Sequence, residues 1–331
     1  MKGTNRKPWA IAGGIVLLTL AAVGISRWFP QPQEPSYRFV LAWGTSGAGA
    51  GQFKHPIGIA IAGEEIFVSD SGNHRIQVFD PQGRFLRSFG SQGEGLGELN
   101  QPMSLGLQGK TLYVAEYLSD RIQKFSLAGK SLGAFGSSGS GPGQFDLPGD
   151  VAVAVDGKIY VADFGNQRVQ AFDPAGQFLY QYGETGRLGI WAGRFNYPTG
   201  VALLPDGNLL VADAYNDRIQ MFEPEGKFVK KWGGPWAINL PGSFYGWFRT
   251  ATAVSAAPTG EIFVADFYNH RIQKFTAKGQ FLTAFGERGQ ASGQLERPTD
   301  MAVDQGGNVY VVDFGNDRIQ KFAPPPSTGN P

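Results

Sequence analysis

The chain contains no cysteine and only three histidines among its 331 residues. The lack of cysteine excludes a disulfide framework, a thiolate metal site and a cysteine nucleophile. An excess of charge of one sign is also missing, because 29 lysine and arginine residues nearly balance 28 aspartate and glutamate residues. We therefore expect no nucleic acid partner. No P-loop, dinucleotide-binding fingerprint or Ser-His-Asp set is recognisable either.

Glycine and aromatic residues are abundant instead. The chain has 48 glycines, and aromatic residues make up 13% of it. Glycine weakens helix interiors but suits tight turns, and aromatic residues are common in strands. The composition therefore favours many short strands joined by turns over a helical bundle.

The N-terminus carries a long apolar stretch. Between Lys7 and Arg27 lie 19 uncharged residues, with Trp9 and Trp28 near the two ends. As a helix they would span roughly 28 Å, close to the ~30 Å hydrocarbon core of a bilayer. We predict a basic tail at 1–8, one transmembrane signal-anchor helix at 9–28 and a Pro-rich linker at 29–37.

Positive charges predict the orientation of this segment. Lys2, Arg6 and Lys7 precede the apolar stretch, and only Arg27 follows it closely. This bias keeps the N-terminus cytoplasmic and places the rest of a single-pass membrane protein in the periplasm or outside the cell. A cleaved signal peptide, with small residues at 22–24, is the alternative, and it sends the body to the same side.

Six copies of one pattern follow. The first reads IFVSDSGNHRIQVF at 66–79, and the others begin at residues 112, 159, 209, 262 and 309. The arginines of successive copies are 46, 47, 50, 53 and 47 residues apart. A strand-rich unit with this period is typical of a β-propeller, with one four-stranded blade per repeat.

A signature of the outermost strand predicts how the ring closes. In the first repeat we expect strands at 58–62, 65–70, 75–80 and 84–89. The last of these belongs to the segment RFLRSFG, which has counterparts in four further repeats but none in the sixth. The missing copy, RFVLAWG, stands at 38–44, ahead of all the repeats. We predict that it is the outer strand of the last blade, giving a propeller over 38–322 and a disordered tail at 323–331.

The repeats resemble those of the NHL family of six-bladed propellers. The resemblance lies in a proline-led inner strand followed by Asp-x-x-Asn-x-Arg-Ile/Val-Gln, as in the stretch from Asp70 to Gln77. It implies an all-β, six-bladed fold. It does not imply one function, since the family includes sensors, protein-binding modules, RNA binders and lyase-like enzymes.

An acid and an arginine recur five residues apart in every repeat. We interpret them, with the intervening asparagine, as a tie for the turn between the second and third strands. The alternative is a ring of arginines around an anionic ligand. The second repeat departs from the pattern, with Glu116 and Ser119 in place of aspartate and asparagine. The pairs are Asp70 and Arg75, Glu116 and Arg121, Asp163 and Arg168, Asp213 and Arg218, Asp266 and Arg271, and Asp313 and Arg318.

One connection between blades is unlike the others. In a propeller these connections share a face, here called the top face, with the turns between second and third strands. The connection at 233–253 is long and aromatic, and the one before it adds further large side chains. We predict a docking surface for a protein, peptide or glycan, since tryptophan, tyrosine and arginine dominate binding hot spots. A loop that packs its own aromatics on the ring or lies against the bilayer is the alternative. The candidate residues are Trp191, Arg194, Trp236, Phe244, Tyr245, Trp247 and Arg249.

No cofactor is predicted, and the sequence offers two alternatives in which a metal is bound. His55, His74 and His270 come from separate top-face segments and could together bind zinc. Asp150 and Asp300 begin inner strands near the channel. The resemblance to six-bladed propellers of the lactonase type implies that calcium could bind there.

The sequence thus favours a membrane-anchored, extracytoplasmic binding module that acts as a sensor or scaffold and not as an enzyme. The alternative is a metal-dependent lyase or lactonase-type hydrolase on the same fold. A purely structural spacer in an envelope complex is a third possibility.

Overall fold

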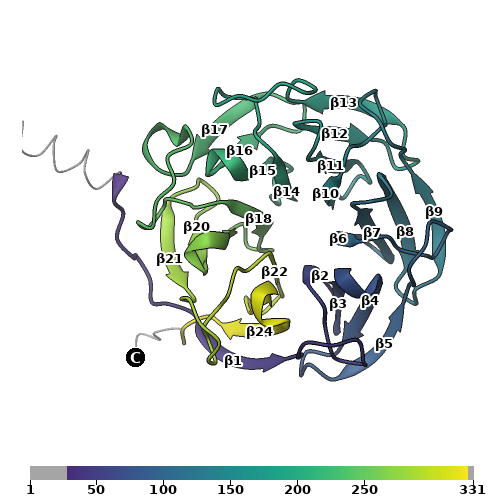
Figure 1. The fold of residues 1–331 in the computed structure, drawn as a ribbon. Helices are drawn as coiled ribbons and strands as arrows, with labels where there is room; N and C mark the ends of the chain where they lie inside the picture. The colour runs from purple at the N-terminus through teal and green to yellow at the C-terminus, as the bar shows by residue number, and fades with distance from the viewer. Residues whose placement is uncertain (1–27, 327–331) are drawn as a thin grey trace, which may run out of the picture.

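The computed structural model describes residues 28–326 and has six four-stranded antiparallel sheets arranged around a central channel (Figure 1). This confirms the predicted all-β, six-bladed fold. The predicted basic tail and all but the last residue of the predicted 9–28 helix lie outside the described residues, as does 327–331. Within 28–326, no helix is both long and apolar enough to cross a membrane.

The blades follow one another along the chain, each from its inner to its outer strand. Blade 1 has β2 (Pro56–Ala62), β3 (Glu65–Asp70), β4 (Arg75–Phe79) and β5 (Phe85–Phe89). Blade 2 has β6 (Pro102–Gln108), β7 (Thr111–Glu116), β8 (Arg121–Ser126) and β9 (Ser131–Phe135). Blade 3 has β10 (Pro148–Val153), β11 (Ile159–Asp163), β12 (Arg168–Phe172) and β13 (Phe178–Tyr182).

The second half of the ring is built in the same way. Blade 4 has β14 (Pro198–Leu203), β15 (Leu209–Asp213), β16 (Arg218–Phe222) and β17 (Phe228–Trp232). Blade 5 has β18 (Ala251–Ala256), β19 (Ile262–Asp266), β20 (Arg271–Phe275) and β21 (Phe281–Phe285). Blade 6 has β22 (Asp300–Val303), β23 (Val309–Asp313), β24 (Arg318–Ala323) and β1 (Arg38–Trp43). Short 3-10 turns are η1 (Ser71–Asn73), η2 (Ala214–Asn216), η3 (Pro235–Ala237), η4 (Phe267–Asn269) and η5 (Phe314–Asn316).

The first strand of the chain closes the ring. β1 runs antiparallel to β24, pairing Arg38 with Ala323 and Trp43 with Ile319 (Figure 1). The predicted closure is therefore confirmed, and β24 has a partner on both sides. Ala323 still belongs to the sheet, so β24 extends one residue into the predicted tail. Closure removes an open strand edge, which would otherwise be a site for unwanted pairing.

The core lies between neighbouring blades. Each hydrophobic cluster combines residues of adjacent sheets, as where Phe67 and Val78 of blade 1 meet Leu112 and Val114 of blade 2. Each connection also contributes one fully buried apolar side chain that sits under the loop. These side chains are Phe53, Leu99, Phe145, Phe195, Phe248 and Leu295.

The predicted linker, residues 29–37, lies against blade 5. The Gln33 amide donates to the Leu282 carbonyl at 2.7 Å, and the Ser36 hydroxyl donates to the Ala284 carbonyl at 3.0 Å. Tyr37 is buried and stacks on Phe285, with ring centroids 4.9 Å apart. Figure 1 shows this segment passing along the outside of β21 before it reaches β1.

Candidate binding surfaces of the top face

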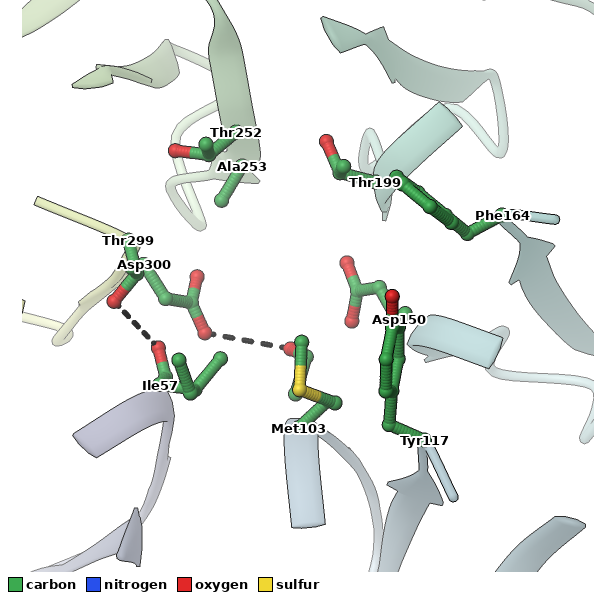
Figure 2. Close-up of a pocket in the computed structure, with 12 residues that line it drawn as sticks. Ile57, Met103, Tyr117, Asp150, Phe164, Thr199, Thr252, Ala253, Thr299 and Asp300 are labelled. Carbon is green, nitrogen blue, oxygen red and sulfur yellow. Dashed lines mark hydrogen bonds between the residues drawn. The ribbon is translucent and has the colours of Figure 1, made fainter. Parts of the chain in front are cut away.

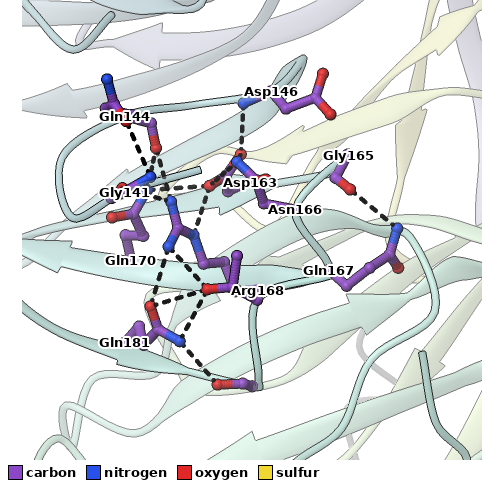
Figure 3. A network of polar contacts seen from close by, with 12 residues as sticks. Gly141, Gln144, Asp146, Asp163, Gly165, Asn166, Gln167, Arg168, Gln170 and Gln181 are labelled. Atoms are coloured by element: carbon purple, nitrogen blue, oxygen red, sulfur yellow. Dashed lines mark hydrogen bonds and ion pairs between the residues drawn. The ribbon is translucent and has the colours of Figure 1, made fainter. Parts of the chain in front are cut away.

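The repeated acid is the hub of a buried polar network in each blade, shown for blade 3 in Figure 3. Asp163 accepts from the Asp146 amide at 2.9 Å, Arg168 Nε at 2.7 Å and Gln170 Nε2 at 3.0 Å. The remaining guanidinium nitrogens of Arg168 donate to two carbonyls of the preceding connection, to Thr185 of the following connection and to Gln181 of β13. The network therefore fastens each connection to its blade.

The same arrangement recurs around the ring. In all six blades the arginine Nε lies 2.6–2.8 Å from an oxygen of the repeated acid. The arginines are committed to this scaffold, which leaves little of any guanidinium for a ligand. Blade 2, whose sequence has Ser119 in place of the asparagine, lacks part of this network. Within the described chain the buried Ser119 hydroxyl has no hydrogen-bond partner. In the other blades the asparagine ties the acid to the connection.

The three histidines do not gather around one point. His74 and His270 follow the repeated asparagine, and their Nδ1 atoms accept backbone N–H groups of the next connection, from Gln101 at 3.3 Å and Arg297 at 3.1 Å. Asp120, Gln167, Asp217 and Asp317 make the same link in the other blades. Burial lowers the pKa of His270, which keeps its ring neutral and its nitrogen an acceptor. His55 lies flat on Phe314, with ring centroids 5.6 Å apart.

A cavity of about 170 Å³ opens at the top of the channel (Figure 2). Asp150 of blade 3 and Asp300 of blade 6 face it from opposite sides of the ring. Each carboxylate accepts two backbone N–H groups, one from the next residue and one from the inner strand of the next blade. These are Val151 and Val201 for Asp150, and Met301 and Ile59 for Asp300. The Ser104 hydroxyl lies 3.4 Å from Asp300 Oδ2.

Burial dominates the electrostatics of this cavity. It raises the pKa of Asp150 to about 6, against the lowering effect of its hydrogen bonds. The pKa of Asp300 is raised well above its usual value, first by burial and then by the charge of Asp150. Ionisation of one carboxyl therefore disfavours ionisation of the other.

The acid pair is a poor match to a metal site. Within residues 28–326, no group of three or more His, Asp or Glu side chains is placed to hold an ion. Calcium prefers six to eight oxygen ligands, but the neighbouring inner-strand positions carry Gly58, Gly200 and Ala253. We therefore derive no metal-dependent step at this cavity.

The predicted docking residues divide between two surfaces. Trp191 and Arg194 line an open groove of about 440 Å³ on blade 4, here called the Trp191 groove. Asn216 and Asn239 also line it, so it lies between the 183–198 connection and the long 233–253 connection. The Trp191 side chain is 70% exposed. Glu184 accepts from both Arg194 and Arg187 at 2.8 Å, which leaves the groove with mixed charge.

Among residues 28–326, one buried side-chain atom at the Trp191 groove lacks a hydrogen-bond partner. Asn216 is buried, and its Nδ2 donates to Gly189 and Asp213. Among the described residues its Oδ1 has no hydrogen-bond partner. A buried acceptor without a donor costs about 1–3 kcal/mol, so such an atom beside an open groove is a candidate ligand contact.

The second surface is an aromatic cluster that includes residues from the N-terminal segment. Trp28 lies 5.4 Å from Trp236, and Phe29 lies 4.8 Å from Phe244 and 5.6 Å from Trp247, measured between ring centroids. Trp247 Nε1 donates to the Trp28 carbonyl at 2.5 Å. Trp236 and Phe244 are nevertheless largely exposed.

The remaining two candidates lie beside these surfaces. Tyr245 stacks on Phe281 of β21 with ring centroids 5.0 Å apart. The guanidinium of Arg249 sits 5.7 Å from the ring of Tyr268. Both side chains therefore have a neighbour within blade 5.

Sequence reasoning missed Ser104, Asn216 and the contribution of Trp28 and Phe29. Asn216 is the motif asparagine of blade 4, and it differs from the other four because the neighbouring loops bury its Oδ1 without a partner. In blade 2, Ser104 stands at the inner-strand position that Asp150 and Asp300 occupy in their own blades. That equivalence could have identified Ser104 as a residue of the cavity. Nothing local links Trp28 or Phe29 to residues more than 200 positions later.

The repeated network and the closed ring define the class of this protein as a six-bladed β-propeller. Solved structures support the fold at 14% identity. A protein of unknown function from Bacteroides thetaiotaomicron has a TM-score of 0.66, with 86% of this chain and 76% of that one covered. A gluconolactonase from Xanthomonas campestris reaches 0.60, covering 90% and 100%. A streptogramin B lyase reaches 0.58, covering 88% and 97%.

The family follows from the repeats. The NHL repeat model matches residues 53–79, 145–172, 195–222, 248–275 and 295–322, so the chain is an NHL-repeat propeller. The unmatched repeat is that of blade 2, which carries Glu116 and Ser119. No curated protein sequence matches the chain.

Proposed function

We propose that this propeller is a membrane-anchored, extracytoplasmic binding module that holds a peptide, protein segment or glycan in the Trp191 groove. The observation that carries the proposal is the exposed indole of Trp191 beside the unpartnered acceptor of Asn216. An indole offers a large flat contact area to a sugar or an apolar side chain, and the amide oxygen would accept one directed hydrogen bond.

A buried side chain beneath the Trp191 groove holds its two walls together. Arg218, which is fully buried beneath it, donates to the Arg194 carbonyl at 2.8 Å and the Ala237 carbonyl at 2.9 Å. One side chain thus ties the two connections that form the groove. Pre-arranged walls lower the entropy that a ligand must overcome on binding.

A substitution series tests the proposal. Trp191→Ala in the full-length chain should abolish crosslinks to its partner in intact cells, while Tyr268→Ala, an exposed aromatic change elsewhere on the top face, should leave them in place. Unchanged crosslinking in the Trp191 variant would remove the groove from consideration.

A lyase or lactonase-type hydrolase is the second candidate, and the buried acid pair favours it. Propellers of similar fold include a streptogramin B lyase and a gluconolactonase. Metal analysis of the purified full chain separates the two functions. Stoichiometric zinc or calcium that is lost in Asp150→Asn would support the enzyme and would contradict the poor match of the acid pair to a metal.

A further inference from the structure

The aromatic cluster has a second feature, which is the absence of charge. We call Trp28, Phe29, Trp236, Phe244 and Trp247 the aromatic seat. The loop that supplies three of its members has no charged residue from Gly233 to Phe248. The comparable stretches of two other connections, 44–53 and 136–145, also lack charge, but they are shorter and each holds a single aromatic residue, the buried Phe53 or Phe145. What sets the 233–248 stretch apart is its length together with its exposed aromatic side chains.

The seat also leaves large apolar side chains uncovered. Trp236 is 68% exposed, and Phe244, Leu240 and Phe29 are exposed as well. The ring contacts hold these side chains together without burying them. A contiguous exposed apolar patch of this kind marks an interaction site.

The residues that precede Trp28 indicate what contacts the aromatic seat. The uncharged stretch of residues 8–26 ends two residues before Trp28. Even a fully extended chain advances only about 3.5 Å per residue. If that stretch crosses a bilayer, Trp28 must lie within several ångströms of the membrane interface, and the seat must lie there with it.

The segment after Trp28 is bound to blade 5, so it cannot extend and let the propeller move away from the membrane. It is fastened by the bond from Trp247 to the Trp28 carbonyl and by the backbone bond from Gln33 to Leu282. Lys274 adds an ion pair to Glu34 at 2.8 Å. The linker is thus packed along blade 5 and is not a free spacer of nine residues.

We propose that the aromatic seat inserts into the interfacial region of the lipid bilayer and fixes the propeller with the blade 4–5 edge on the membrane. This rests on the proposed membrane anchor. Tryptophan favours the headgroup region because its ring is amphipathic, and a loop without charges enters that region at little electrostatic cost. The Trp191 groove shares the 233–253 connection with the seat, so its ligand binds close to the membrane surface.

The absence of native cysteine makes a direct test possible. Single variants Trp236→Cys and Phe244→Cys of the full-length chain are labelled with a small environment-sensitive fluorophore. They are reconstituted into phosphatidylcholine vesicles with or without brominated acyl chains. The control is Leu96→Cys, in the connection that leads from blade 1 to blade 2, whose 66% exposure matches that of Trp236. Leu18→Cys reports on the anchor.

Membrane seating predicts that brominated lipid quenches the labels at 236 and 244, while the label at 96 keeps its emission. Quenching at 18 without quenching at 236 and 244 would overturn the seat and leave the anchor in place. No quenching at 18, 236 or 244 would overturn both. Quenching at 236 and 244 alone would support the seat and reject the anchor.

Discussion

The six equivalent arginines allow one substitution to be compared in six surroundings. The Arg218 side chain is fully buried, whereas that of Arg75 is 16% exposed. Both bind the repeated acid through Nε, at 2.6 Å and 2.8 Å. Only Arg218 also reaches the Ala237 carbonyl, because a long connection follows its blade. We expect Arg218→Met to be much more destabilising than Arg75→Met.

The magnitudes follow from what each change leaves behind. Removing one partner of a buried ion pair costs about 3–5 kcal/mol, because the other charge stays buried. Asp213 is fully buried, and burial already raises its pKa against the attraction of Arg218. We expect a loss of about 4 kcal/mol in Arg218→Met. At Arg75 water can enter the opening and hydrate the acid, so about 2 kcal/mol is expected.

Urea unfolding followed by circular dichroism, with the full chain in detergent, measures both losses. The double variant Asp213→Asn with Arg218→Met should recover part of the loss, since a neutral amide replaces the stranded charge. Equal losses at the two arginines, or a loss below about 1 kcal/mol at Arg218, would refute the argument from burial.

Three further outcomes are expected. Trp43→Ala should lower the free energy of unfolding by about 3 kcal/mol and expose β1 to protease, because Trp43 packs between Phe79 and Tyr310 at the ring closure. Urea unfolding and limited proteolysis measure these two effects, and unchanged stability would contradict the prediction. Asp150 loses its proton near pH 6 when folded and near 3.8 when unfolded, so stability should fall by up to about 3 kcal/mol as pH rises through this window, and Asp150→Asn should flatten that slope in pH-dependent unfolding. Gly58→Ala should cost about 1–3 kcal/mol, since its Cβ would lie 2.5 Å from the Met103 carbonyl oxygen; a thermal midpoint equal to that of the unmodified chain would count against that contact.

The fold was predictable because its signals are local and repeated. The stretch from Asp70 to Gln77 contains its own turn, and five similar stretches set the number of blades. The outer-strand signature at 38–44 was recognisable without its partner, because it copies a strand present in five other repeats. In the first repeat the strand bounds agreed to within two residues, because local turn residues such as Pro81 and Gly83 mark where strands end.

The candidate sites were predictable only in part. Trp191 and Trp236 stood out as aromatic residues in irregular connections, but their division between a groove and a seat could not be read from the sequence. That division depends on Trp28 and Phe29, which reach blade 5 only because β1 completes blade 6 and brings the preceding segment past β21.

By itself the sequence determined the repeat, the number of blades, the strand that completes the last one and the residues of the turn network. The repeat, the blades and the turn network depend on contacts within about 50 residues, which a periodic pattern records. The closing strand pairs Arg38 with the distant Ala323, and it was recognisable only because it copies the outer-strand signature of the other repeats. Only the tertiary structure decided that Asp150 and Asp300 face one cavity, that Arg218 supports two loops and that Trp28 rests on Trp236. Those contacts join distant parts of the chain, and the curvature of the closed ring sets their distances.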